Sequence, residues 1–178
     1  MFEGWGEFYL MAGGAAAVLI GLIFVVVTLM SDRPRATVLA GARLYMGPIV
    51  LQISFVLVLS AAALMPGIRV REFALVAAIL ALWGMARGIQ STVGISALKG
   101  EDTPHWTDVW FYGVIPTLLS VLLAGVAFAF WSGLEWATHA VAAANIAFLL
   151  LAVRNEWDLV TWLAPRPDGP EPTFRNDG

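Results

Sequence analysis

The sequence contains no cysteine and only one lysine, Lys99. The absence of cysteine excludes disulfide bonds, cysteine-ligated zinc or iron–sulfur centres, and thiol nucleophiles. The remaining cations are arginines that form no basic tract. Because a nucleic-acid-binding surface needs such a tract, we expect no nucleic-acid partner.

Charge of either sign is also scarce. Charged residues make up 13% of the 178 residues and hydrophobic residues 60%, with a net charge of -3, whereas a soluble domain carries about 25% charged residues. A chain this apolar cannot cover a water-soluble core with polar side chains. The charges fall in short clusters between long apolar runs, which is typical of a protein with several membrane-spanning segments.

Five apolar stretches have the length of a membrane span. A spanning helix needs about 20 mainly apolar residues, and four stretches supply them directly. The fifth is shorter, and we expect its helix to continue towards residue 163. The stretches cover residues 8–30, 44–65, 73–98, 109–131 and 137–153. Because none shows the alternation of barrel strands, the sequence predicts an all-α integral membrane bundle of five transmembrane helices.

The ends of the spans predict the orientation in the membrane. Lysine and arginine are enriched in cytoplasmic loops, and seven such residues lie on the side of the C-terminus, against only Arg69 and Arg71 on the other. We therefore expect the N-terminus outside and the C-terminus in the cytoplasm. The transmembrane domain covers residues 1–164, and the proline-rich residues 165–178 predict a disordered cytoplasmic tail.

Small residues recur at four-residue intervals in two of the spans. Membrane helices approach each other closely at such positions. The first series consists of Gly13, Ala17 and Gly21, and the second of Gly84, Gly88, Thr92 and Ser96. Ordinary packing within the bundle is the first interpretation of both series, and a seam between copies in a homo-oligomer is the alternative.

Arg87 is the one charge inside the third apolar stretch. A charge at bilayer depth is costly, so it raises a question about function. Gln90 and Ser91 follow at helical spacing and share its face. Three interpretations remain open: a guanidinium that reaches to the cytoplasmic surface, a ligand or ion site, and a structural ion pair. The candidate partners for an ion pair are Asp108, Glu156 and Asp158.

Two amides lie in other spans, Gln52 in the second and Asn145 in the fifth. Amides in membrane helices most simply hydrogen-bond across to a neighbouring helix. They could equally complete a polar pocket with Arg87, Gln90 and Ser91, and the sequence does not choose between these roles.

Short motifs near the N-terminus carry a resemblance. The opening Trp5-Gly-Glu-Phe-Tyr9, the small-residue stretch after it and the run Gly21-Leu-Ile-Phe-Val25 resemble a loose group of small bacterial multi-pass membrane proteins. The segment Arg154-Asn-Glu-Trp-Asp158 also resembles sequences of this group. Most members are uncharacterised, and some are described as modulators of a membrane-bound AAA protease. The resemblance covers about the first 30 residues, implies the bacterial inner membrane, and carries over no functional residue.

No catalytic pattern is visible in the chain. It lacks a Ser/His/Asp arrangement, an HExxH motif, a glycine-rich phosphate loop and paired intramembrane acids, so we expect neither an enzyme nor a cofactor. The leading hypothesis is a non-catalytic subunit, scaffold or modulator that acts through helix–helix contacts. Its partners would be the lipid bilayer and a second copy or another membrane protein. The alternative is a small oligomeric channel or transporter with a polar pathway around Arg87, and a third hypothesis is a quinone or cofactor protein.

Overall fold

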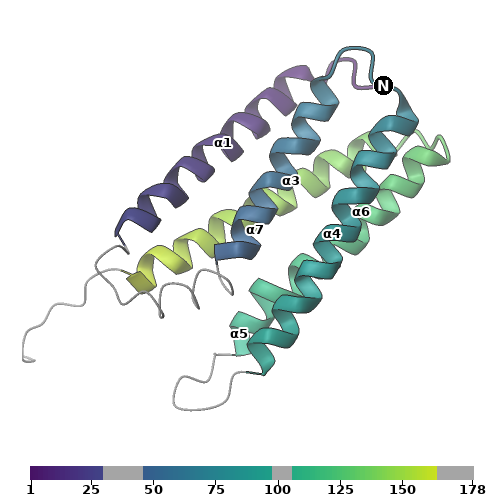
Figure 1. Cartoon of the computed structure of the whole chain (residues 1–178). Helices are drawn as coiled ribbons and strands as arrows, with labels where there is room; N and C mark the ends of the chain where they lie inside the picture. Colours follow the sequence, from purple (N-terminus) through teal and green to yellow (C-terminus); the bar gives the residue numbers. More distant parts are fainter. Residues whose placement is uncertain (30–45, 98–105, 164–178) are drawn as a thin grey trace, which may run out of the picture.

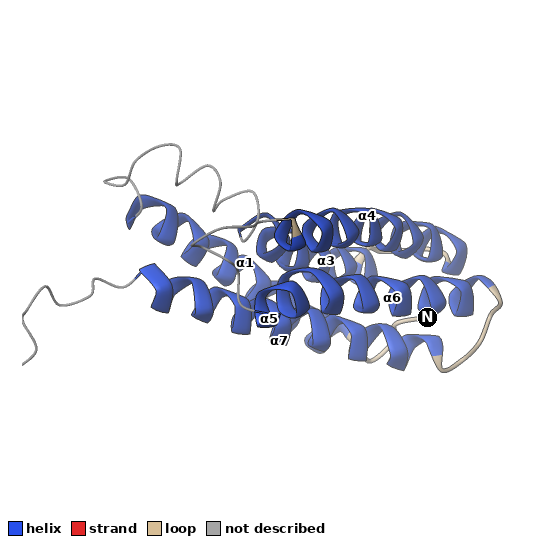
Figure 2. Ribbon diagram, turned by 90° about the horizontal axis from the view of Figure 1, so that it is seen from below, coloured by secondary structure: helices blue, strands red, loops and turns tan. Residues whose placement is uncertain are grey.

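The structure, a computed structural model, describes residues 1–29, 46–97 and 106–163, which are drawn in colour in Figure 1. In these three ranges the secondary structure is helical and no strand is present (Figure 2). The all-α class predicted from the sequence is therefore confirmed. The predicted tail, residues 165–178, lies outside the described residues.

Within the described ranges, five helices are long and apolar enough to cross a membrane. The prediction of five spans is confirmed, and the molecule is a multi-pass membrane protein. Four spans are continuous helices, and one is assembled from three consecutive segments. The bounds are α1 (Gly6–Leu29), α3 (Gly47–Leu64), α4 (Val70–Ser96), α5 (Trp106–Val109) followed by the π-helical η2 (Trp110–Val114) and α6 (Ile115–Trp131), and α7 (Ala137–Leu163).

Helix α4 begins three residues before the apolar stretch that predicted it. Its first turn is charged and capped by Arg69 and Glu72. The backbone N–H of Arg69 donates to Glu72 Oε2 at 3.0 Å, and the Arg69 guanidinium lies 2.6 Å from Glu72 Oε1. Such reciprocal capping satisfies N–H groups that the first turn leaves open. A count of apolar residues misses this turn because its stability comes from polar contacts.

The last helix extends well beyond its apolar stretch. α7 has 27 residues and ends at Leu163, which confirms the predicted continuation past residue 153. The second span begins at Gly47, with Pro48 in its first turn, where the missing N–H of proline costs no helical hydrogen bond. Residues 44–45 of the predicted stretch lie outside the described residues.

The fourth span contains a widened turn that the sequence did not predict. Helix η2 comes directly before Pro116, and the N–H of Ile115 donates to the carbonyl of Trp110, five residues back. Proline has no N–H to continue the backbone hydrogen bonds of a helix. A π-helical turn beside a proline is one of the usual ways in which a membrane helix adjusts to that loss.

Figure 1 shows α1 lying along α3 and α4 lying along α6, with α7 crossing behind α3. α3 and α4 are joined by a short turn at Met65–Arg69. We call the end of the bundle at this turn the outer end and the opposite end the inner end, after the predicted orientation. Because successive helices alternate in direction, α3 begins at the inner end and α4 and α7 finish there.

The small-residue series of α4 packs inside the bundle. A Cβ placed on Gly88 would lie 3.2 Å from the Cα of Thr117 in α6, and one placed on Gly113 would lie 2.9 Å from the Cα of Thr92. Gly84 faces Ser120 and Phe55 in the same way. These close approaches support the first interpretation of this series, packing within the chain.

The series of α1 divides between two surroundings. A Cβ on Gly13 would lie 3.2 Å from Ser60 Cβ of α3, whereas a Cβ on Gly21 would meet no described residue within 4 Å, and Ala17 is exposed. Only 22% of the most apolar window of α1 is buried, the smallest share among the five spans. The outer face of α1 is therefore available to lipid or to a partner.

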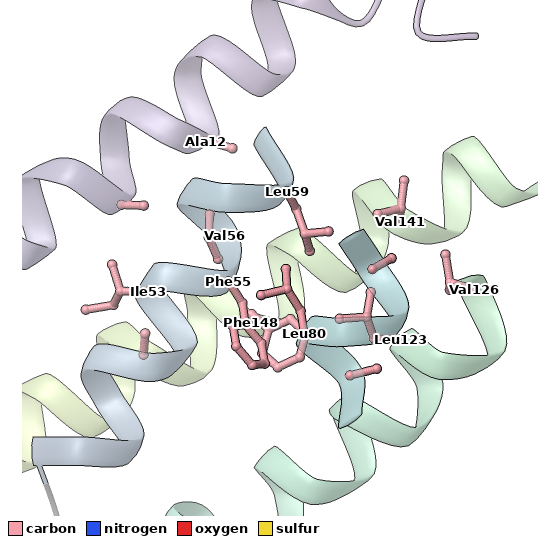
Figure 3. Close-up of a cluster of buried hydrophobic side chains, with 14 of the residues drawn as sticks. Ala12, Ile53, Phe55, Val56, Leu59, Leu80, Leu123, Val126, Val141 and Phe148 are labelled. Carbon is pink, nitrogen blue, oxygen red and sulfur yellow. The ribbon is translucent and has the colours of Figure 1, made fainter. Parts of the chain in front are cut away.

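Aromatic side chains close the outer end of the bundle. Phe2 packs edge-on against Tyr9 and Phe73, with ring centroids 5.2 and 4.8 Å apart, and Phe73 lies 4.9 Å from Phe130. Tyr9, Phe73 and Phe130 are almost fully buried. Below them, the apolar core continues through Leu59, Leu80, Leu123 and their neighbours (Figure 3). This half of the bundle is densely filled.

Candidate ligand-binding site

The inner half of the bundle contains a cavity of about 340 Å³. Its walls come from α3, α4, η2 and α6, with one residue from α7. The volume is at the small end of the range of about 300–1,000 Å³ that small-molecule sites occupy. The lining residues are Pro48, Leu51, Gln52, Phe55, Gly84, Arg87, Gly88, Gln90, Ser91, Tyr112, Pro116, Ser120 and Phe148.

Arg87 and Gln90 form the exposed rim of the cavity on α4. Arg87 Nη1 donates to Gln90 Oε1 at 3.0 Å, and both side chains are exposed. The oxygen of the Gln90 amide is thus directed at the guanidinium, and its NH₂ group remains to donate elsewhere. The rim accordingly presents N–H donors from both side chains, the arrangement that suits an anion or another strong acceptor.

Gln52 and Ser91 lie deeper, in the wall of the cavity. Gln52 is 3% exposed and Ser91 8% exposed. In the described part of the chain, the amide nitrogen and oxygen of Gln52 have no hydrogen-bond partner. The same is true of the Ser91 hydroxyl. A buried polar group without a partner costs about 1–3 kcal/mol. Because both residues line one cavity, a molecule bound there is a candidate partner for these groups.

The opposite wall is fixed to α7 through the widened turn. Tyr112 lines the cavity, is 3% exposed, and donates its hydroxyl to the carbonyl of Asn155 at 3.1 Å. In return, Asn155 Nδ2 donates to the carbonyl of Phe111 at 3.0 Å. In the register of η2, the N–H that would reach this carbonyl belongs to residue 116, which is a proline. The Asn155 amide therefore supplies the hydrogen bond that Pro116 cannot make.

Arg154 reinforces the same contact from outside. Its guanidinium lies 3.3 Å from the centroid of the Phe111 ring, and its Nη1 donates to Asn155 Oδ1 at 3.1 Å. It also lies 3.4 Å from Asp158 Oδ2, one turn further along α7. The inner end of α7 thus holds the wall of the cavity through a continuous set of polar contacts.

Four of the five residues considered for a polar pocket line this one cavity: Arg87, Gln90 and Ser91 from α4 and Gln52 from α3. The fifth, Asn145, is placed elsewhere. Its Nδ2 donates to Ser60 Oγ at 2.9 Å, so that it ties α7 to α3 nearer the outer end. Its role is the hydrogen bond across helices that was the simpler of the two interpretations.

The three candidate carboxylates make other arrangements. Asp158 pairs with Arg154 on its own helix. Glu156 is buried, and both of its carboxylate oxygens are without a hydrogen-bond partner among the described residues. Asp108 lies in the first turn of α5. Within the described ranges Arg87 makes no ion pair with a carboxylate, and its hydrogen bond is to Gln90.

Three residues of the site were not anticipated from the sequence: Tyr112, Ser120 and Asn155. Asn155 carried the clearest signal, because it is a polar residue inside a helix that also contains Arg154 and Asp158. Ser120 is buried and donates to the carbonyl of Pro116 at 2.8 Å, and its hydroxyl lies at the interface with α4, beside Gly84. Tyr112 gave no signal of its own, since tyrosine is common at the ends of spans.

The arrangement can bind a polar group but offers little for metal binding. No group of three or more histidine, aspartate or glutamate side chains that could hold a metal is found in the described residues. The cavity combines one guanidinium, two amides and hydroxyl groups with aromatic and aliphatic walls. It can therefore hold a molecule with one acceptor-rich end and one apolar end.

Comparisons with protein-family models, with curated proteins and with solved structures find no match.

Proposed function

We propose that this membrane protein is a non-catalytic binding protein whose cavity between α3, α4 and α6 holds a small polar ligand. One observation carries the proposal: Gln52 and Ser91 line the cavity beneath a rim that contains Arg87, and among the described residues the Gln52 amide and the Ser91 hydroxyl have no hydrogen-bond partner. Burial of such groups is unfavourable unless a partner is bound. A ligand with acceptor and donor groups would supply these partners.

The shape of the cavity favours binding over conduction. Its lining reaches Phe55, Gly84 and Ser120 and does not extend further towards the outer end. Beyond these residues the bundle is filled by Leu80, Leu123 and the aromatic cluster around Phe73. A channel would need a polar path through this half as well. A site closed at its outer end supports a receptor, carrier subunit or ligand-dependent modulator better than a pore.

A cavity-filling variant tests the proposal. We would purify the wild-type protein and Gln52→Phe in mild detergent, denature both, and identify small molecules and lipids in the extracts by mass spectrometry. The proposal predicts a molecule that co-purifies with the wild type in near-stoichiometric amount and is lost from Gln52→Phe. Ser54→Ala, on a neighbouring part of α3 outside the cavity, is the matched control. Equal recovery from all three proteins would refute the proposal.

A second candidate function is the helix-contact scaffold. It is supported by the exposed face of α1, where Ala17 is exposed and a Cβ on Gly21 would meet no atom of the described residues within 4 Å. Such a face permits close approach of another membrane helix. Crosslinking in native membranes should then capture a second copy or a different membrane protein, and Gly21→Leu should weaken the capture. Crosslinking that recovers neither would remove this candidate.

The proposal includes a location. The resemblance of the opening residues and the charge pattern support the bacterial inner membrane, with the N-terminus outside and the C-terminus in the cytoplasm. In this orientation the cavity lies in the cytoplasmic half of the bilayer. A ligand would therefore approach from the inner leaflet or from the cytoplasm.

A further inference from the structure

We infer that the ligand of this cavity is an amphiphile with an anionic head, either a phosphate or a carboxylate, which Arg87 and Gln90 bind while its apolar chain leaves between α3 and α4 into the bilayer. The inference rests on the proposed function of the same site. It specifies the chemical class of the ligand and the side from which the ligand arrives.

The polar groups of the rim select an anion. Arg87 donates one hydrogen bond to Gln90 Oε1, which consumes the one strong acceptor of the rim. The remaining guanidinium N–H groups and the Gln90 NH₂ are donors. Among the described residues that line the cavity, none is an aspartate or a glutamate. A cationic head would therefore meet a positive charge and no carboxylate, whereas a phosphate or carboxylate would receive charge-assisted hydrogen bonds.

The rest of the wall suits an apolar chain. Phe55 of α3 and Phe148 of α7 meet edge to face, with ring centroids 5.6 Å apart (Figure 3). Leu51 and Pro48 continue this surface towards the inner end of α3. The cavity volume of about 340 Å³ is near the lower limit of the range of about 300–1,000 Å³ for small-molecule sites. That space holds a head group and a short length of chain, so the remainder of a lipid must lie outside.

The opening lies on the flank of the bundle. α3 and α4 each supply part of the wall of the cavity. Away from Arg87 and Gln90, the lining residues Tyr112, Ser120 and Phe148 are buried and close the cavity. Arg87 and Gln90 are exposed, and they mark the open side. A flank of a membrane bundle faces lipid, so a molecule dissolved in the bilayer can reach the cavity directly.

The depth of Arg87 matches a lipid head. At 1.5 Å per residue, Arg87 lies about 25 Å along α4 from Val70, close to the inner limit of a hydrocarbon core of about 30 Å. Gln90 follows Arg87 towards the inner end, so the guanidinium is directed away from the bilayer centre. The long arginine side chain can reach from this level to the phosphates of the inner leaflet. A guanidinium that merely reaches the surface would contact any phosphate, whereas a ligand site requires the cavity beside it.

Native mass spectrometry with defined probes tests the inference. The detergent-purified protein would be titrated with dioleoyl phosphatidic acid, oleate, dioleoyl phosphatidylcholine and inorganic phosphate. We expect phosphatidic acid and oleate to bind at least tenfold more tightly than phosphatidylcholine, with inorganic phosphate not competing. Arg87→Gln should weaken the binding of phosphatidic acid about tenfold, because charge-assisted hydrogen bonds are lost. Arg71→Gln is the matched control, since Arg71 is on the same helix but lies over Trp131 at the outer end.

Each result decides the matter. Unchanged binding in Arg87→Gln, or an equal loss in Arg71→Gln, overturns the inference. Inorganic phosphate that binds alone, or a neutral molecule that Gln52→Phe displaces, also overturns it while leaving the proposed function intact. If phosphatidic acid binding is weakened by Arg87→Gln but unchanged by Gln52→Phe and by the smaller Gln52→Leu, the lipid contacts the surface and not the cavity. That result overturns both the inference and the proposed function.

Discussion

Asn155 Nδ2 donates a hydrogen bond to the carbonyl oxygen of Phe111 at 3.0 Å, across the interface between α7 and the widened turn η2. This bond replaces the backbone hydrogen bond that Pro116 is unable to form. The same turn carries Tyr112 into the wall of the cavity. A side chain of α7 thus supplies a hydrogen bond that the backbone of the fourth span lacks. The turn that it stabilises carries a residue of the site.

The first prediction concerns this bond. Asn155→Ala removes a buried donor and leaves the Phe111 carbonyl without a partner, so we expect the free energy of unfolding to fall by about 1–2 kcal/mol. Thr161→Ala, which removes an exposed hydroxyl from the same helix, should have little effect. Equilibrium unfolding in mixed micelles measures both changes.

A double-mutant cycle separates this bond from the other contacts of Asn155. In a Pro116→Ala background, residue 116 regains an N–H that can reach the Phe111 carbonyl. The cost of Asn155→Ala should then be smaller than in the wild type, by about 0.5 kcal/mol or more. Strictly additive effects of the two substitutions would contradict this account of the widened turn.

The second prediction concerns the contact between α4 and α6. A Cβ on Gly88 would lie 3.2 Å from the Cα of Thr117, a backbone atom that cannot move aside cheaply. Gly88→Ala should therefore destabilise the protein by about 1–3 kcal/mol through overpacking. Gly125→Ala is the control, because a Cβ at this position meets no atom within 4 Å. The thermal unfolding temperature of Gly88→Ala should be clearly lower than that of Gly125→Ala. Equal temperatures for the two variants would show that α4 and α6 do not touch at Gly88.

The third prediction compares two buried amides. Gln52 has no hydrogen-bond partner in the described part of the chain, whereas Asn145 donates to Ser60. In the ligand-free protein, Gln52→Leu should raise the free energy of unfolding by about 1 kcal/mol, because it removes an unsatisfied group. Asn145→Leu should lower it by a similar amount. A loss of stability in Gln52→Leu equal to that in Asn145→Leu would mean that the Gln52 amide is already satisfied within the protein.

The fourth prediction concerns orientation. The chain contains no cysteine, so single cysteines can be introduced without background labelling. With a membrane-impermeant maleimide on intact spheroplasts, Ser132→Cys in the turn after α6 should be labelled. Asn176→Cys in the predicted tail should be labelled only after the membrane is opened. The reverse pattern would invert the orientation and place the cavity in the outer leaflet.

The sequence predicted the fold well because membrane-spanning helices are set by length and apolarity, which can be counted along the chain. It did not show the charged first turn of α4, which Arg69 and Glu72 stabilise. It also missed η2, because a change of helical register leaves the apolar content of the span unaltered. A count of apolar residues therefore does not predict polar caps or changes of helical register.

The site was predicted in part for a similar reason. The pairing of Arg87 with Gln90 follows from spacing within one helix, and the structure contains it. Whether Gln52 or Asn145 joins them depends on how α3 and α7 are rotated against α4, and this rotation depends on packing between helices, such as the contact of Gly84 with Phe55 of α3. Spacing within a single helix holds no information on that rotation.

An experimental structure of the protein in nanodiscs that contain phosphatidic acid is the most direct test of the central claim. We predict ligand density inside the cavity, with its head within hydrogen-bond distance of the Arg87 guanidinium and its chain between α3 and α4 beside Phe55. A cavity that holds only water, or one that is closed by side chains while Arg87 contacts bulk lipid, would contradict the claim.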